Sequence, residues 1–401
     1  MNMNQTPHRA IYLDYQASTP MDERVVQAMA PYFTKKFGNP HSTGHMYGWE
    51  AEEAVDHARE QVAGLIGAEP EDIYFTSGAT ESNNLAIKGV ARFYESRKNH
   101  LITLATEHMC VLDSALDLES EGFDVTYLPV DSSGLMDLNQ LRRAVTPQTL
   151  LVSVMAAHNE IGTLQPIAEI GAICRENKVF FHTDAAQAAG KIPLDVDEMQ
   201  IDLMSISAHK MYGPMGVGAL YVRRRPRVRL KPLFSGGGQE GDLRSGTVPT
   251  PLCAGLGKAA EISGAEMEAE AGRLRKLRDH LAEKLAQGIP HSHINGCMDK
   301  RLPGNLNLAI PGIDAQRLIA ALPDLALSWG SACSSAESTS SHVLAAIGLD
   351  EAASHSSLRI GLGRMTTEEE VETAARRMCE EVTRLGAEFE ALGANRARVA
   401  G

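Results

Sequence analysis

Several common features are scarce or missing in this 401-residue sequence: apolar runs long enough to span a bilayer, a hydrophobic N-terminal leader, and an excess of positive charge. Lys and Arg number 38 against 51 Asp and Glu, so the formal net charge is −13. A negative surface disfavours direct binding to nucleic acid, because the phosphate backbone attracts cationic proteins. We therefore expect a cytoplasmic protein that binds neither membranes nor nucleic acid directly.

Paired cysteines and the common nucleotide-binding motifs are also missing. The 6 cysteines lie far apart, so the sequence has no CxxC pair of the kind used by zinc sites and dithiol enzymes. No GxGxxG follows a predicted strand, and no GxxxxGKS occurs. These absences predict no metal site and exclude the usual nucleotide fingerprints. All cysteines except Cys333 are expected to be ordinary buried thiols.

The middle of the sequence alternates between short apolar runs and helix-length amphipathic stretches. The apolar runs cover residues 73–76, 101–106, 125–130, 150–155, 179–183, 203–207 and 217–222. This alternation predicts an α/β fold, with a mostly parallel seven-stranded sheet covered by helices on both faces. In such sheets ligands bind at the carboxyl ends of the strands, so functional side chains are expected directly after the apolar runs.

The composition changes after about residue 260. Residues 261–287 are rich in charge and carry leucines at helical spacing, which predicts a helix with one core-facing side. We expect a large domain at 16–260 and a smaller α+β domain formed by 1–15 and 261–401. Residues 328–341 are rich in Ser and Ala without periodicity, so a mobile loop is expected at about 326–341. Residues 367–392 predict a closing helix.

Polar or ionisable groups follow five of these seven runs. They lie in the segments 77–83, 106–108, 159–162, 184–187 and 207–210. Each is weak evidence alone, since a hydroxyl-rich segment is often a helix cap and a single histidine is often structural. Because all five are expected at the same edge of the sheet, together they predict a functional site there.

Asp184 and Lys210 give this site a chemical meaning. A lysine can form a Schiff base with pyridoxal phosphate, while a carboxylate keeps the pyridine nitrogen of that cofactor protonated. The protonated ring then stabilises negative charge at the α-carbon of a bound amino acid. Gln187 is placed to hydrogen-bond the phenolic oxygen of the ring. Taken alone, Lys210 would be interpreted as a surface lysine, and Asp184 as an aspartate that caps a helix.

Many segments together resemble one known family. The sequence is similar to the NifS/IscS-like cysteine desulfurases, within the fold-type-I pyridoxal-phosphate enzymes (class V aminotransferases). The resemblance extends from about residue 12 to about residue 370, and its most specific segments are 37–40, 76–82, 106–108, 159–162, 182–187, 207–210, 244–247, 330–335 and 356–359. It implies a fold-type-I transferase that works as a homodimer.

The resemblance also implies roles for individual residues. Lys210 would hold pyridoxal 5′-phosphate and act as a base, and His108 would stack on the ring and assist proton transfer. The remaining cofactor-binding positions implied are Ala79, Thr80, Asp184, Gln187, Ser207, His209 and, from the partner subunit, Thr247. Asn159 and Arg359 would bind the carboxylate of the substrate L-cysteine, since a planar guanidinium matches a carboxylate.

Cys333 would be the nucleophile. Its thiolate would attack the sulfur of the bound substrate, leaving a persulfide on Cys333 and releasing L-alanine. The persulfide would pass to an acceptor protein, such as an iron–sulfur scaffold, and Cys333 is also a candidate for a transient cluster ligand. The alternative interpretation is that Cys333, as a cysteine in a loop rich in Ser and Ala, has no catalytic role.

Some positions depart from the family pattern. Trp329 stands where a small residue is usual, Ala208 replaces a glycine, and His158 replaces an asparagine. Residues 338–341 also differ. The acceptor and its pathway are left open by the sequence: cluster assembly, tRNA thiolation or DNA sulfur modification. Two other functions remain as alternatives, namely another pyridoxal-phosphate activity, such as selenocysteine lyase or aminotransfer, and a non-catalytic partner in sulfur relay.

Overall fold

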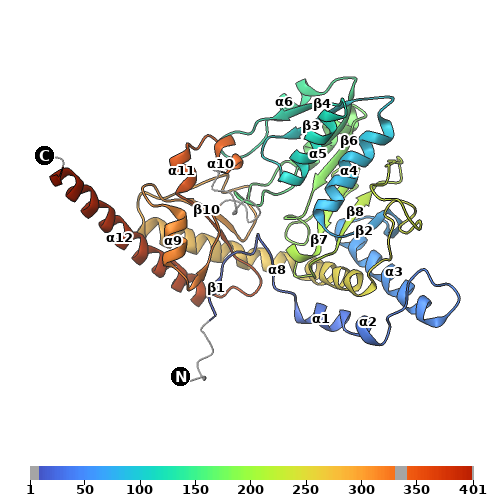
Figure 1. Ribbon diagram of the computed structural model, residues 1–401, viewed down its shortest axis with the longest axis horizontal. Coiled ribbons are helices and arrows are strands. Elements are labelled where there is room, and N and C mark those ends of the chain that lie inside the picture. Colours follow the sequence, from blue (N-terminus) through green and yellow to red (C-terminus); the bar gives the residue numbers. More distant parts are fainter. Residues whose placement is uncertain (1–8, 330–340, 400–401) are drawn as a thin grey trace.

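The computed structural model describes residues 9–329 and 341–399, with side chains through residue 388. Its largest element is a seven-stranded sheet with the order β2-β8-β7-β6-β5-β3-β4 (Figure 1). Strands β3 to β7 pair in parallel, and only β8 runs antiparallel to its neighbours β7 and β2. The expected mostly parallel seven-stranded α/β sheet is therefore confirmed.

Each strand of this sheet overlaps one of the apolar runs. The strands are β2 (Ile73–Thr76), β3 (His100–Leu104), β4 (Asp124–Leu128), β5 (Thr149–Ser153), β6 (Phe180–Asp184), β7 (Leu203–Ser207) and β8 (Gly218–Val222). All residues of β3, β5, β7 and β8 are buried. Strands covered on both faces need apolar side chains on both, which explains why the runs are continuous rather than alternating.

Helices cover both faces of the sheet, as expected. On one face, α4 (Ala79–Tyr94) and α5 (Met109–Ser120) pack with Leu203 and Leu220 in one apolar cluster. On the other, α3 (Met46–Ile66) and α7 (Ile167–Glu176) pack with Met204 and Ile206. The remaining elements before residue 250 are α1 (Glu23–Met29), α2 (Pro31–Thr34), η1 (Pro70–Asp72), α6 (Leu138–Ala144) and η2 (Ala208–Lys210).

A second group of elements surrounds a separate apolar cluster. It contains an antiparallel sheet with the order β12-β10-β9 and a short parallel pair, β1 with β11. Their bounds are β1 (Ile11–Tyr12), β9 (His293–Ile294), β10 (Asn305–Ala309), β11 (Leu325–Ala326) and β12 (Ser357–Gly361), and the helices of this group are α9 (Ala315–Ala321) and α12 (Glu368–Val399). Two short helices, α10 (His342–Ala346) and α11 (Glu351–His355), precede β12, and α10 packs with Ile161 in a smaller apolar cluster. No helix in the described part of the chain is long and apolar enough to cross a membrane.

Helix α8 (Thr250–Gly288) runs across the molecule between the two groups (Figure 1). Its first half places Leu256 and Ala260 in the core of the large sheet, and its second half places Leu274 and Leu281 in the second cluster. The expected leucine stripe is thus buried. The expected domain boundary at 260/261 falls inside this continuous helix and stays a prediction.

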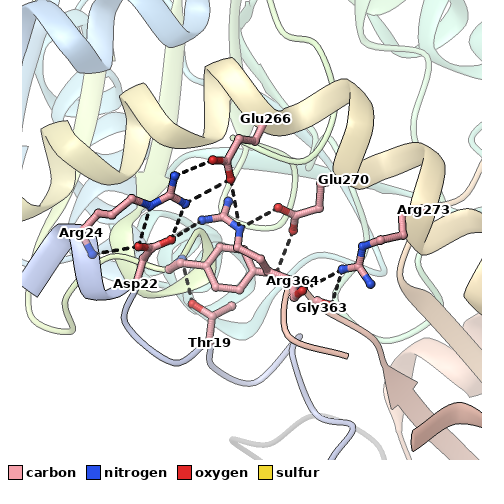
Figure 2. A network of polar contacts seen from close by, with 9 residues as sticks. Thr19, Asp22, Arg24, Glu266, Glu270, Arg273, Gly363 and Arg364 are labelled. Carbon is pink, nitrogen blue, oxygen red and sulfur yellow. Dashed lines mark hydrogen bonds and ion pairs between the residues drawn. The ribbon is translucent and has the colours of Figure 1, made fainter. Parts of the chain in front are cut away.

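A network of charged side chains connects the N-terminal segment, α8 and the turn after β12 (Figure 2). Arg364 is its centre: Nη1 lies 2.8 Å from Asp22 Oδ2, and Nε lies 2.8 Å from Glu270 Oε2. The Arg364 guanidinium also lies over the ring of Tyr212, at 4.1 Å from the centroid. Hydrogen bonds from Arg24 and Arg364 hold the pKa of Asp22 well below its usual range. The network therefore joins three segments that are far apart in the sequence.

This network predicts a specific loss of stability. Replacing Arg364 by Met leaves the buried carboxylate of Asp22 and the partly buried carboxylate of Glu270 with fewer partners, so we expect the free energy of unfolding to fall by about 3 kcal/mol. Urea denaturation followed by circular dichroism measures it. Arg376→Met is the control, because Arg376 makes an exposed pair with Glu380 on α12 and should cost less than about 0.5 kcal/mol. Equal losses in both variants would contradict a structural role for the network.

Candidate active site

A cavity of about 390 Å³ lies where β2, β3, β5, β6 and β7 end. The residues that follow or end these strands line it, as the carboxyl-end rule predicts for a mostly parallel sheet. The predicted site residues brought together here are Ala79, Thr80, His108, Asn159, Asp184, Gln187, Ser207, His209, Lys210 and Arg359. Thr247 is exposed and is not among the residues lining the cavity of its own chain. Cys333 lies outside the described residues.

One end of the cavity is formed by the N-terminus of α4. Gly78 is the N-cap, with a φ of 147° that side-chain-bearing residues rarely adopt, and a Cβ built there meets no atom within 4 Å. The first N–H groups of a helix have no acceptor within the helix, and its dipole favours an anion. Glu81, in the same turn, is paired with Arg244 at 2.8 Å. This pairing offsets the negative charge of Glu81, so the helix end is suited to a phosphate.

Ser207 and His209 reach the same cavity from the end of β7 and from η2. Burial, reinforced by the nearby charges of Lys210 and Lys191, lowers the pKa of His209 to about 4. The imidazole is therefore neutral at pH 7. A neutral imidazole and a hydroxyl can each donate one hydrogen bond to an anion without adding a charge.

Asp184 is held in a fixed orientation at the end of β6. Its Oδ2 accepts from Asn83 Nδ2 at 2.6 Å, and its Oδ1 accepts from the backbone N–H of Ala186 at 2.9 Å. The second N–H of the Asn83 amide points to Cys110 Sγ at 3.2 Å. The carboxylate thus faces the cavity with its rotation restricted by two donors.

Lys210 and Gln187 share an acceptor in the N-terminal segment. Lys210 Nζ donates to the backbone oxygens of Gln16 (2.6 Å) and Ala17 (2.7 Å), and Gln187 Nε2 donates to the same Gln16 oxygen at 2.9 Å. Both side chains line the cavity. The position of this segment consequently determines the position of two predicted cofactor-binding groups.

The tautomer of neutral His108 follows from its place at the start of α5. His108 is the N-cap of this helix, and its Nδ1 accepts from the backbone N–H of Cys110 at 3.2 Å. A ring nitrogen that accepts from an N–H carries no proton itself, so the proton of neutral His108 is on Nε2. The local fold therefore selects the tautomer that can donate from Nε2.

His158 occupies the position where the family usually has asparagine, and it is structural. Its Nε2 donates to the Thr106 carbonyl at 2.8 Å, and its Nδ1 accepts from the backbone N–H of Glu160 at 3.0 Å. Burial lowers its pKa to about 3, so the ring stays neutral. His158 thereby connects the turn carrying Asn159 to the strand end that precedes His108.

Arg359 is fully buried in β12, with 1% of its surface exposed, yet borders the cavity. Its Nη2 lies 2.8 Å from Asp14 Oδ1, and its Nη1 donates to the Asn159 carbonyl at 3.2 Å. Among the described residues its Nε has no hydrogen-bond partner. A buried donor without a partner is costly, and a carboxylate in the cavity is a fitting acceptor for it.

Several residues of the site were missed as functional candidates by sequence reasoning. Asn83 supports Asp184, Asp14 pairs with Arg359, and Lys191 Nζ donates to Gln187 Oε1 at 3.1 Å. The signals that could have found two of them are helical spacings, because Asn83 lies three residues after Thr80 and Lys191 lies four residues after Gln187. Asp14 had no such signal.

In the sequence, Glu107 was noted only as part of the segment 106–108. In the structure its side chain is buried, and this burial changes the pKa of its carboxyl group. Its Oε1 accepts from the backbone N–H of Met155 at 2.8 Å, and its Oε2 has no partner among the described residues. Burial raises the pKa of Glu107 well above its usual range, which favours the neutral form of this carboxyl group.

The residues present fit pyridoxal phosphate. The end of α4 with Ser207 and His209 suits a phosphate, Asp184 offers a fixed carboxylate to a ring nitrogen, and Lys210 offers an amine. The donor set comprises one anchoring lysine, one carboxylate and an anion-binding helix end, which is the set that this cofactor needs.

Comparisons with known proteins agree with this assignment. Residues 11–373 match the family model described as "Aminotransferase class-V". A cysteine desulfurase of Mus musculus is 59% identical over 94% of this chain and 82% of its own length. A solved "NifS-like protein" superposes with a TM-score of 0.87 at 38% identity, covering 93% of this chain and 99% of the other. The structure named "SspA in complex with cysteine" has a TM-score of 0.79 at 42% identity, covering 89% and 99%.

The family match spans most of the chain, and the identity to the curated relative is far above the level at which only a fold is shared. The cavity described above contains the lysine, carboxylate and arginine on which the expected resemblance rests. The chain therefore belongs to the class-V aminotransferase family and groups with its cysteine desulfurases.

Proposed function

We propose that the protein removes sulfur from L-cysteine with the help of pyridoxal 5′-phosphate held by Lys210, giving L-alanine and a persulfide on Cys333. The observation that carries the proposal is the convergence of Lys210, Asp184, His108 and Arg359 on one cavity. Lysine and aspartate alone suit any enzyme of this cofactor class. The buried arginine adds a site for the carboxylate of an amino acid, and the similarity to cysteine desulfurases supplies the substrate.

Side chains at different positions of the cavity have different roles in the proposed reaction. The cofactor, when bound, supplies an electron-withdrawing ring that stabilises negative charge at the substrate α-carbon. Asp184, fixed by Asn83 and Ala186, holds a proton at the ring nitrogen. Lys210 Nζ, at the cavity wall, moves the proton of the α-carbon. His108 Nε2, which carries the ring proton in the neutral tautomer, is the donor for a second proton transfer.

Arg359 binds and orients the substrate carboxylate. Its guanidinium already pairs with Asp14 and lies in a buried strand, so its position changes little when a ligand arrives. Pre-positioning of this kind lowers the entropy cost of aligning the substrate. The side chain of Asn159 lines the same part of the cavity and is proposed as a second carboxylate ligand.

Cys333 receives the sulfur. Its thiolate attacks the sulfur of the bound cysteine, so an S–S bond forms as the C–S bond breaks. The electron pair of the broken bond remains on the carbon, which takes up a proton and leaves as L-alanine. No external oxidant is needed, because the sulfur is oxidised while the carbon is reduced. The persulfide then passes to an acceptor thiol, for which a scaffold protein of iron–sulfur assembly is the proposed partner.

The active form is proposed to be a homodimer in the cytoplasm. Thr247 does not line its own cavity but is exposed, so a second copy can bring it to the partner's phosphate-binding end. An exposed apolar patch near α2 and α3 supports such an interface, and its members are Phe33, Phe37, Met46, Tyr47 and Trp49. The five cysteines of the described part are free thiols, consistent with a reducing compartment.

The two central assignments have separate tests. Lys210→Ala should abolish the visible absorption of the lysine-bound cofactor and all alanine production. Cys333→Ala should keep the absorption band but lose desulfuration of L-cysteine by at least about 100-fold, because the nucleophile is gone. Alanine and sulfide released in the presence of a reductant measure both. Cys379→Ala, on α12, is the control and should retain activity.

A Cys333→Ala protein with full activity on L-cysteine would contradict the proposed nucleophile. The same variant assayed on selenocysteine distinguishes a lyase, which does not need Cys333, from a desulfurase.

Arg359→Lys tests the carboxylate site. Lysine keeps the charge that Asp14 needs but has no planar fork, so one hydrogen bond to the substrate carboxylate is lost. We expect KM for L-cysteine to rise about 10-fold, equivalent to about 1.4 kcal/mol, with kcat changed less. Steady-state kinetics measure both constants. A lower kcat with unchanged KM would place the role of Arg359 elsewhere in the reaction.

A mixed dimer tests whether Thr247 acts across the interface. In a heterodimer of a Lys210→Ala subunit and a Thr247→Ala subunit, one site has both Lys210 and Thr247 only if Thr247 comes from the partner. We expect that site to bind pyridoxal phosphate as tightly as the wild type, whereas the Thr247→Ala homodimer binds it more weakly. Tagged co-purification, light scattering and cofactor titration give the measurements. Weak binding in both dimers, or a monomeric mass, would contradict the proposal.

A further inference from the structure

Lys191 lies four residues after Gln187, in the turn segment that follows β6, and is not among the residues that line the large cavity. Its Nζ donates to Gln187 Oε1 at 3.1 Å, and the Nε2 of the same amide donates to the Gln16 carbonyl at 2.9 Å. Lys191 also borders a small cavity of about 20 Å³, together with Glu270 and Tyr212. The side-chain amide of Gln187 is therefore held between a cationic donor and a backbone acceptor.

This arrangement allows only one orientation of the amide. A protonated lysine side chain donates but cannot accept, and a backbone carbonyl accepts but never donates. Rotating the Gln187 amide by half a turn would set its NH₂ against Lys191 and its oxygen against the Gln16 carbonyl. The contact between the two oxygens would then be repulsive at any pH, and the contact with Lys191 would be repulsive while its amine is protonated. Because Nε2 carries two protons and Gln16 takes one, the second proton remains for the cavity that Gln187 lines.

We propose that Lys191 is a positioning residue that fixes the Gln187 amide so that its Nε2 donates to the phenolic oxygen of the bound cofactor. The inference rests on the proposed function, because it requires pyridoxal phosphate at Lys210. Without Lys191 the amide can rotate, and its oxygen can then face the negatively charged phenolic oxygen. Lys191 thus acts on the cofactor through Gln187 and does not touch the reacting atoms.

Lys191 also has an electrostatic effect on the bound cofactor, and this effect shifts the pKa of the lysine–cofactor linkage in the same direction as the hydrogen bond from Gln187. Burial, aided by the positive charges of Lys210 and Arg359, lowers the pKa of Lys191 to about 7, while Glu270 opposes the shift. A neutral amine still donates hydrogen bonds, so the contact with Gln187 persists on both sides of this pKa. A donor and a nearby cation both stabilise the phenolate form of the ring. Both therefore lower the pKa of the lysine–cofactor linkage, whose proton is shared with that phenolate.

The pKa of this linkage is read directly from the visible absorption of the holoenzyme as pH is raised. Lys191→Met removes the donor at similar side-chain length, and we expect the absorption pKa to rise by about 0.5–1 unit. Lys191→Arg keeps a donor-only cation and should restore most of the wild-type value. Lys276→Met, which removes an exposed lysine on α8, is the control for loss of charge and should leave the titration unchanged.

A double-mutant cycle separates positioning from charge. If Lys191 acts mainly through Gln187, then Lys191→Met causes a clearly smaller shift in the Gln187→Ala background than in the wild type, and the part that remains measures the effect of its charge. A full additional shift in the Gln187→Ala background would overturn the inference, as would an unchanged titration in Lys191→Met. Thermal unfolding and the affinity of each apoprotein for pyridoxal phosphate establish that the variants are folded and loaded. A wild-type protein without the absorption band would refute the proposed function itself, whereas a wild-type band with unshifted Lys191→Met refutes only the role of Lys191.

Discussion

The chain between Asp14 and Asp22 is the constraint on which the rest of the site depends. Asp14 pairs with Arg359, the Gln16 carbonyl accepts from Lys210 and Gln187, and Asp22 pairs with Arg364. One short segment, which includes a turn at 15–17, thus contacts groups from the large sheet and from the second group of elements. The relative positions of the cofactor-binding lysine and the carboxylate-binding arginine follow from how this segment is held.

The large sheet and the edge that carries the cavity could be predicted from the sequence alone. Continuous apolar runs identify strands that are covered on both faces, and parallel strands place their carboxyl ends together. Asp184 and Lys210 were therefore expected at this edge, and both line the cavity there. The tautomer of His108 could not be predicted from the sequence, because it follows from a hydrogen bond to the folded backbone at the start of α5.

The contacts of the N-terminal segment could not be predicted in the same way. Gln16 acts through its backbone carbonyl, and every residue has one, so the side-chain sequence contains no signal for this contact. The pair of Asp14 with Arg359 joins residues separated by almost the whole chain. No periodicity connects them, because they meet only where β12 runs beside the start of the chain. Lys191 was within reach of prediction through its helical spacing from Gln187, but its role needed the orientation of the amide.

The pairing of Arg359 with Asp14 also affects how the product leaves. L-Alanine has the same carboxylate as L-cysteine, so any attraction that Arg359 exerts applies equally before and after the sulfur is removed. Binding energy of this uniform kind does not speed the chemical step, and excess of it retains the product. Because one face of the guanidinium is already neutralised by a built-in carboxylate, the arginine orients its ligand without holding it too tightly, and the site can be emptied for the next turnover.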